Sequence, residues 1–150
     1  MNKVPVNLSV KINRQKEINY GIKNISTYVK FAKRVKSSKK KLKKIFLQIK
    51  NKKKNIIGYG VTAKSTTILN YCDIGKKFIS YFLDTTKDKQ NKFTPGTKIP
   101  IYKYPGFVEK NIDYIFLGAW NFKEEIFKKE KKFIKNGGKF IIHTPMPKII

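Results

Sequence analysis

An α/β fold, with a doubly wound and mainly parallel sheet preceded by a long N-terminal helix, is the fold class that the sequence predicts. Two observations predict it. From Asn55 onward, short apolar runs alternate with stretches of helical periodicity, as in folds whose parallel strands are joined by crossover helices. Residues 1–54 are instead polar and rich in lysine. We therefore expect an N-terminal strand and linker helix over 1–54, and an α/β domain over 55–150.

Two periodic patterns occur before Asn55. Alternating apolar residues predict a strand, which would be an edge strand or the remnant of a preceding domain: Val4, Val6, Leu8, Val10 and Ile12. Ser26 is then a plausible N-cap for a helix whose apolar residues recur at helical spacing from Tyr28 to Ile49. The polar stretch 37–41 interrupts this pattern, so the helix is exposed or bent there, or meets a partner; for its lysines we favour a solvated face.

The elements expected after Asn55 follow in order along the chain. Strands are predicted over 55–60, 78–83, 98–102, 112–117 and 140–143, and a long polar loop over 85–98. Helices are predicted over 64–71 and 121–135. Asn121 would cap the second helix, with Glu124 three residues later, and Gly137 and Gly138 would end it.

Charge and composition limit the classes of function. The formal net charge is +26, and all but two of the 35 basic residues are lysines spread along the whole chain. A polyanion partner and codon drift toward lysine both explain this charge; we favour drift, because nucleic-acid sites depend on arginine. Nucleic acid is thus an unlikely partner. The sequence has no long apolar run and no signal-like start, so we expect a cytoplasmic protein with no membrane contact. It has one cysteine and one histidine, so we expect no zinc site on this chain.

The first strand–helix turn carries the strongest local signal. Gly58, Gly60 and Ala63 are small residues that let a ligand approach the backbone, and the helix start after them favours an anion. A cation and hydroxyl donors cluster at the same place, contributed by Lys64, Ser65, Thr66 and Thr67. Asp84 ends the second strand, where the acidic residue of a dinucleotide-binding fold meets a ribose. The pattern leaves open nucleotide binding and a purely structural turn.

Four blocks of sequence resemble the C-terminal domain of S-adenosylmethionine-dependent sugar C-methyltransferases. The first is GYGVTAKSTTILNYCDIG, Gly58–Gly75, and the others follow in the family's order: Leu83–Ile101, Leu117–Ile126 and Asn136–Ile149. Upstream, YVKFAKRV resembles the family's linker helix. The resemblance covers about residues 20–150. It implies a Rossmann-like domain that helps to hold a nucleotide-linked deoxysugar.

The resemblance also implies roles for particular residues. Gly58, Tyr59, Gly60, Ala63, Lys64 and Ser65 would form the loop facing the substrate, with Asn70 and Tyr71 on the helix behind it. Asp84, Lys89 and Gln90 would lie on the long loop, and Trp120 and Asn121 at the end of a central strand. From the residues alone, Tyr71 and Cys72 read as core and Asn121 as a helix cap. Trp120 is either buried or a stacking surface, Lys64 is the favoured phosphate ligand, and His143 is not expected to be a catalytic base.

The family's zinc domain and S-adenosylmethionine domain have no counterpart in this sequence. We therefore expect no cofactor on this chain, with S-adenosylmethionine on a separate domain or subunit and a methyltransferase chain as a possible partner. Two alternatives remain: an independent NAD- or nucleotide-binding protein, and, less favoured, a basic nucleic-acid-binding protein.

Overall fold

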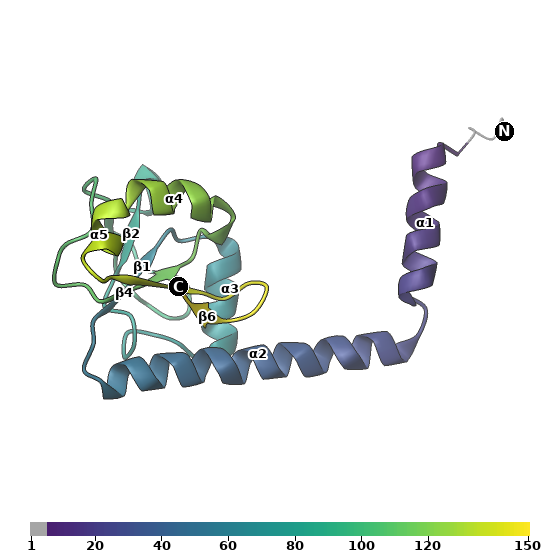
Figure 1. The fold of residues 1–150 in the computed structure, drawn as a ribbon, viewed down its shortest axis with the longest axis horizontal. Helices are drawn as coiled ribbons and strands as arrows, with labels where there is room; N and C mark the ends of the chain where they lie inside the picture. The colour runs from purple at the N-terminus through teal and green to yellow at the C-terminus, as the bar shows by residue number, and fades with distance from the viewer. Residues whose placement is uncertain (1–5) are drawn as a thin grey trace. The chain divides into compact units, whose positions relative to one another are not determined.

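The computed structural model describes residues 6–150, and its centre is a six-stranded sheet of order β3-β2-β1-β4-β5-β6 (Figure 1). The first five strands are parallel, and the last pairs antiparallel with β5. Their bounds are β1 Ile56–Tyr59, β2 Phe82–Asp84, β3 Ile101–Lys103, β4 Tyr114–Leu117, β5 Lys139–Ile142 and β6 Lys148–Ile149. The order reverses at β1, as in doubly wound dinucleotide-binding folds. The predicted fold class is confirmed.

The chain forms two compact units, and the boundary between them falls between Ser37 and Ser38. In the first unit, helix α1 covers Leu8–Tyr20. The side chain of Asn7 accepts a hydrogen bond from the Ser9 amide, and Gly21 at φ 80° ends the helix. The strand predicted here is therefore wrong, and Val4 lies outside the described residues. A lone strand leaves its backbone groups without partners, whereas a helix pairs them internally.

Helix α2, Ile25–Asn51, begins in the first unit and ends in the second. The Thr27 amide donates to the Asn24 carbonyl, so the helix starts one residue before Ser26, the predicted cap. In the second unit α2 buries an apolar stripe with spacings of three and four residues, consisting of Leu42, Ile45, Phe46 and Ile49. The predicted long helix is confirmed, and its C-terminal part belongs to the core of the sheet domain.

Each face of the sheet carries its own apolar cluster, because side chains alternate along every strand. The α2 stripe packs on one face with residues of helix α3, Ala63–Cys72, and with inward residues such as Phe82 and Phe116. The ring of Phe46 lies 5.7 Å from Phe78 and 5.8 Å from Phe116, centroid to centroid. Burying one such ring contributes roughly 2–3 kcal/mol, so this cluster anchors the end of α2.

The opposite face is covered by two short helices, α4 Lys123–Lys129 and α5 Lys131–Lys135, which Figure 1 shows above the sheet. One continuous helix over 121–135 was expected, and this is wrong. The break falls at Glu130, which is buried and whose Oε1 accepts a 2.6 Å hydrogen bond from the Tyr104 hydroxyl. Gly137, at φ 87°, ends α5 as the sequence predicts, donating its amide to the Ile134 carbonyl.

The strand predictions hold with shifts at the ends. Of the apolar run 78–83 only the last residues form β2, because Phe78 and Ile79 close a turn onto Gly75. The third strand lies slightly later than expected, and β6 was not predicted at all. A two-residue edge strand has too little periodicity to be seen in sequence. Among the described residues, no helix combines the length and the apolar character that crossing a bilayer requires.

The Tyr104–Glu130 pair gives a test of this packing. Burial, followed by the hydrogen bond to Glu130, raises the pKa of Tyr104, so its hydroxyl remains a donor. Tyr104→Phe removes that donor and should lower the free energy of unfolding by about 1–3 kcal/mol, the cost of an unsatisfied buried acceptor. Urea titration followed by circular dichroism measures the change. Tyr102→Phe, at an exposed tyrosine of the same segment, is the matched control and should change little; equal losses would contradict the assignment.

Candidate functional site

The candidate site is a crevice at the C-terminal ends of β1 and β4, where the strand order reverses. Ligands of open α/β sheets bind at such a switch point. The two loops approach so closely that only glycine fits: a Cβ on Gly118 would overlap the Gly60 carbonyl oxygen. Gly60 also adopts φ 76°, which side chains disfavour. Gly58 lies deeper, where a Cβ would overlap the Phe82 ring.

Helix α3 starts at the crevice with a reciprocal cap. The Thr62 hydroxyl accepts a hydrogen bond from the Ser65 backbone amide at 3.1 Å, and the Ser65 hydroxyl accepts one from the Thr62 backbone amide at 2.9 Å. The Thr62 hydroxyl also lies 3.1 Å from the Gly118 carbonyl, and this contact joins α3 to the loop after β4. Ser65 is fully buried in this cap and holds the helix start in place, although the resemblance assigned it to the substrate side.

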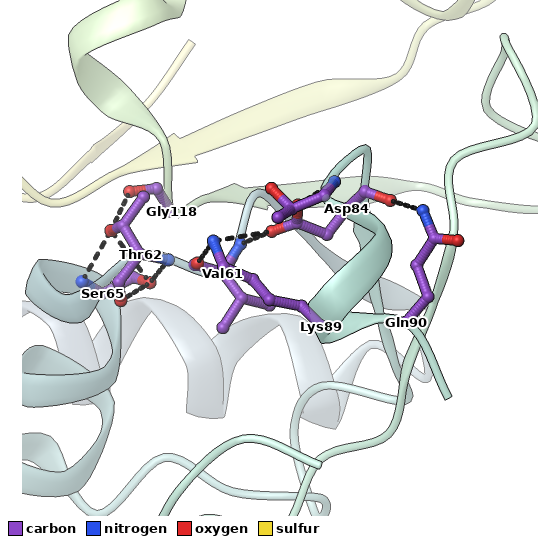
Figure 2. Close-up of polar contacts among 8 residues, drawn as sticks. Val61, Thr62, Ser65, Asp84, Lys89, Gln90 and Gly118 are labelled. Atoms are coloured by element: carbon purple, nitrogen blue, oxygen red, sulfur yellow. Dashed lines mark hydrogen bonds and ion pairs between the residues drawn. The ribbon is translucent and has the colours of Figure 1, made fainter. Parts of the chain in front are cut away.

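Asp84, at the end of β2, is tied into the loop by both carboxylate oxygens (Figure 2). Oδ2 accepts a hydrogen bond from the Val61 backbone amide at 2.7 Å, and Oδ1 accepts one from the Thr86 backbone amide at 2.8 Å. Lys89 Nζ lies 3.6 Å from Oδ2 and donates to the Val61 carbonyl at 2.7 Å. Gln90 donates to the Asp84 carbonyl at 3.1 Å. With its side chain only 6% exposed, the Asp84 carboxylate is engaged by the loop itself rather than presented to a ribose as in a dinucleotide-binding fold.

The crevice contains a hollow of about 310 Å³, called the crevice hollow below. Four of the residues expected at the site line it: Tyr59, Gly60, Asp84 and Lys89. Eight further residues complete its wall, namely Thr62, Thr85, Thr86, Ala119, Phe122, Glu125, Ile126 and Lys129. The wall therefore combines apolar rings and methyl groups with hydroxyl, carboxylate and ammonium groups, which suits a partly polar ligand.

A second hollow, of about 520 Å³, lies on the other side of the start of α3. Ala63, Thr66 and Lys89 line it, together with apolar residues that include the exposed Phe93. Thr62 and Lys89 border both hollows. Half of the residues predicted for one site thus line these two depressions, and the other half, namely Gly58, Lys64, Ser65, Gln90, Trp120 and Asn121, line neither.

Lys64 and Trp120 lie together outside the linings of these two hollows. Lys64 Nζ is 5.7 Å from the centre of the Trp120 ring, a distance typical of a cation–π contact. Trp120 and Asn121 belong to a short 3-10 turn, η2 Trp120–Phe122, that precedes α4. Asn121 is exposed and does not cap α4, whose N-cap position is held by Phe122 without a side-chain bond. The predicted capping role of Asn121 is wrong, because the 3-10 turn carries the chain into the helix.

Asn70, Tyr71 and Cys72, at the end of helix α3, differ in burial and in their contacts. Asn70 donates to the carbonyls of Thr66 and Pro95, so it fastens α3 to the long loop. Cys72 is buried, as predicted. Tyr71 is 43% exposed, and Lys39 Nζ lies 4.5 Å from the centre of its ring. The prediction that Tyr71 is a core residue is wrong, because the next position, Cys72, faces the core instead.

Two titratable groups near the site are held in their neutral forms. Burial raises the pKa of Tyr59, in the floor of the crevice hollow, to about 12. Burial lowers the pKa of His143 to about 4. The His143 ring stacks on Phe116, and its Nδ1 lies 2.8 Å from the Thr144 hydroxyl. A buried imidazole stacked on an apolar ring supports the expectation that His143 is not a catalytic base.

Sequence reasoning missed one wall of the crevice hollow. Phe122, Glu125, Ile126 and Lys129 follow β4 at spacings of three and four residues, which place them on one face of η2 and α4. That spacing was a usable signal, because the helix after a central strand borders the switch point. Thr85 and Thr86 carried no such signal. Within the described residues, no three His, Cys, Asp or Glu side chains are grouped so as to hold a metal ion.

Comparison with known proteins gives two matches. The family model of the C-methyltransferase C-terminal domain matches residues 2–145. C-methyltransferase NovU of Streptomyces niveus is 35% identical over 134 residues, which is 89% of this chain. The aligned region is 32% of the NovU sequence, so the chain spans about a third of the relative that it matches.

The Asp84 contacts predict a specific loss in the loop. In Asp84→Asn, the side-chain NH2 group would face one of the two backbone amides that now donate hydrogen bonds to the carboxylate. The substitution also removes the negative charge beside Lys89. The free energy of unfolding should fall by about 1–3 kcal/mol, and hydrogen exchange at Val61 and Thr86 should accelerate. Asp88→Asn is the control, because that carboxylate is exposed and forms no ion pair with any described residue. Unchanged exchange at Val61 and Thr86 would refute this role of Asp84.

His143 predicts how stability depends on pH. Its pKa falls from 6.5 to about 4 on folding, so the unfolded chain binds more protons between these values. Stability is therefore fully present above pH 6.5 and decreases as the pH falls toward 4, by about 2 kcal/mol at pH 5. Urea midpoints at pH 7, 6 and 5 measure the slope. His143→Phe should flatten it, and the chain has no second histidine to replace the effect; parallel slopes would contradict this explanation.

Proposed function

We propose, from the premise that this chain belongs to the C-methyltransferase C-terminal domain family, that its crevice hollow binds a nucleotide-linked deoxysugar. The observation that carries the proposal is the position and lining of this hollow. It lies at the switch point of the sheet, and apolar and polar groups share its wall. In this proposal the chain acts as the substrate-holding part of a sugar C-methyltransferase.

The lining supports a sugar ligand in detail. Phe122 is 61% exposed and offers a ring on which the apolar face of a sugar can stack. Glu125 can accept hydrogen bonds from hydroxyl groups, and Thr85 and Thr86 can donate or accept them. Lys129 supplies a cation for a phosphate from the same wall. Lys64 and Trp120 would extend the site toward the nucleotide.

The residues around the loop do not fit S-adenosylmethionine or NAD. Both ligands need an acidic side chain with acceptors free for the ribose. Here that position is Asp84, whose carboxylate is only 6% exposed, accepts hydrogen bonds from two backbone amides and faces Lys89. We therefore assign methyl transfer and its methyl donor to a separate domain or subunit, and we derive no chemical step on this chain.

A cytoplasmic location belongs to the same proposal. The single cysteine, Cys72, is a buried free thiol, which suits a reducing compartment. The partner would be the polypeptide that carries the methyl donor.

Calorimetric titration of the full chain with a panel of nucleotide-linked sugars, free nucleotides and NAD tests the proposal. A sugar nucleotide should bind more tightly than its free nucleotide, because the sugar contacts Phe122 and Glu125. The double variant Glu125→Gln/Lys129→Gln should weaken that binding about tenfold, or by about 1.4 kcal/mol.

The matched control is Glu124→Gln/Lys128→Gln. It makes the same chemical changes one residue earlier, at exposed positions outside the crevice hollow. Binding in this control should stay within about twofold of the unaltered chain. Lys64→Ala in the same titration tests the residue that the sequence favours for phosphate. Preference for NAD, or no binding of any sugar nucleotide, would overturn the proposal.

A further inference from the structure

Five lysines line one hollow at the edge of the sheet opposite the crevice. The crevice lies beyond the C-terminal ends of the strands, whereas this hollow includes Asn55 and Ile56 at the start of β1. Its volume is about 250 Å³. We call it the lysine hollow; its basic residues are Lys50, Lys53, Lys54, Lys76 and Lys77.

These lysines come from two segments that the core holds together. Lys50 lies in the last turn of α2, and Lys53 and Lys54 lie in the segment that follows the helix. Lys76 and Lys77 lie in the turn between α3 and β2. Phe78, which is buried against Phe46, anchors both segments. The ammonium groups of Lys50 and Lys77 lie 5.6 and 5.4 Å from the centre of the Phe78 ring. Their convergence is therefore set by packing rather than by flexible side chains alone.

The positive charge in the lysine hollow is only partly neutralised. Lys54 Nζ pairs with Asp113 at 2.8 Å, and Lys77 Nζ lies 4.0 Å from Asp73. Lys50, Lys53 and Lys76 form no ion pair with any described residue. The C-terminal end of a helix favours a nearby cation, which accounts for Lys50 in the last turn of α2 and for Lys53 and Lys54 just after it. It does not account for Lys76, which comes from another segment and whose ammonium group lies 5.2 Å from the centre of the Phe93 ring.

Neutral donors stand beside these cations. The backbone amides of Lys76 and Lys77 and the hydroxyl of Ser80 have no hydrogen-bond acceptor among residues 6–150. No carboxylate forms part of the lining as described. Unpaired ammonium groups and free amides around one small depression are the groups that bind phosphate oxygens.

We propose that the lysine hollow binds a compact anion of several phosphates, such as pyrophosphate, tripolyphosphate or the phosphate chain of a nucleotide. This site goes beyond the proposed function, because it lies at the other edge of the sheet from the crevice hollow. The anion would lie between the end of α2 and the 76–77 turn. It would neutralise the three unpaired lysines and tie the two segments together.

Nuclear magnetic resonance titration of the full, isotope-labelled chain with tripolyphosphate tests this inference. Shift changes should concentrate on the amides of Lys76, Lys77 and Ser80. The triple variant Lys50→Gln/Lys53→Gln/Lys76→Gln should bind at least about tenfold more weakly. Lys54 stays unaltered so that its ion pair with Asp113 is kept, and the unperturbed part of the spectrum reports that the fold is intact.

The control variant is Lys128→Gln/Lys132→Gln/Lys135→Gln, which removes the same charge from exposed positions on α4 and α5. It should stay within about twofold of the unaltered chain. ATP that binds like tripolyphosphate identifies a nucleotide's phosphate chain as the ligand, and failure of ATP to bind identifies free polyphosphate. Equal weakening in both triple variants would overturn the inference in favour of a diffuse field of lysines. A short oligonucleotide that displaces tripolyphosphate at far lower concentration would overturn it in favour of nucleic acid.

Discussion

The carboxylate of Asp84 joins the segments that form the crevice. It accepts hydrogen bonds from one backbone amide in the loop after β1 and from one in the loop after β2. It also lies beside Lys89, whose ammonium group donates a hydrogen bond to the Val61 carbonyl. A buried carboxylate is stable only when its oxygens have hydrogen-bond partners, so these contacts hold the two loops in their positions. The crevice hollow and the second hollow both depend on this arrangement, since Lys89 borders each of them.

The same contacts use, within the loop itself, groups that bind the ligand in dinucleotide-binding folds. In a dinucleotide fold the acidic residue at the end of the second strand is free for a ribose. Here it stabilises the loop, and the capping box of Thr62 and Ser65 likewise uses hydroxyl groups that could have met a phosphate. What remains open to a ligand lies farther along the crevice, on Phe122, Glu125 and Lys129 of the wall after β4. These groups are the ones on which the proposed ligand would depend, since one fold can carry different sites at the same switch point.

Lysine has more than one role in this chain. Most lysines are exposed and follow no pattern in the sequence, as composition drift would produce. Folding gives a few of them defined neighbours: Lys89 in the loop behind the crevice, Lys54 against Asp113, and Lys64 over Trp120. Drift explains how many lysines there are, and it leaves unexplained why five of them surround one hollow.

The sequence by itself determined the alternation of strands and helices, the parallel sheet, the long helix and the family. Each depends on local periodicity or on ordered blocks of sequence, which are present before folding. It also placed Gly58 and Gly60 at the first crossover, because a tight turn requires small residues. Helix α1 is held by local hydrogen bonds that the alternating pattern did not reveal. Only the tertiary structure decided that the helix after β4 is interrupted at Glu130 and that Tyr71 faces solvent. These outcomes depend on partners distant in sequence, such as Tyr104 for Glu130. The lining of the crevice hollow and the convergence of lysines around Phe78 were decided in the same way, since packing brings together side chains that no local pattern connects.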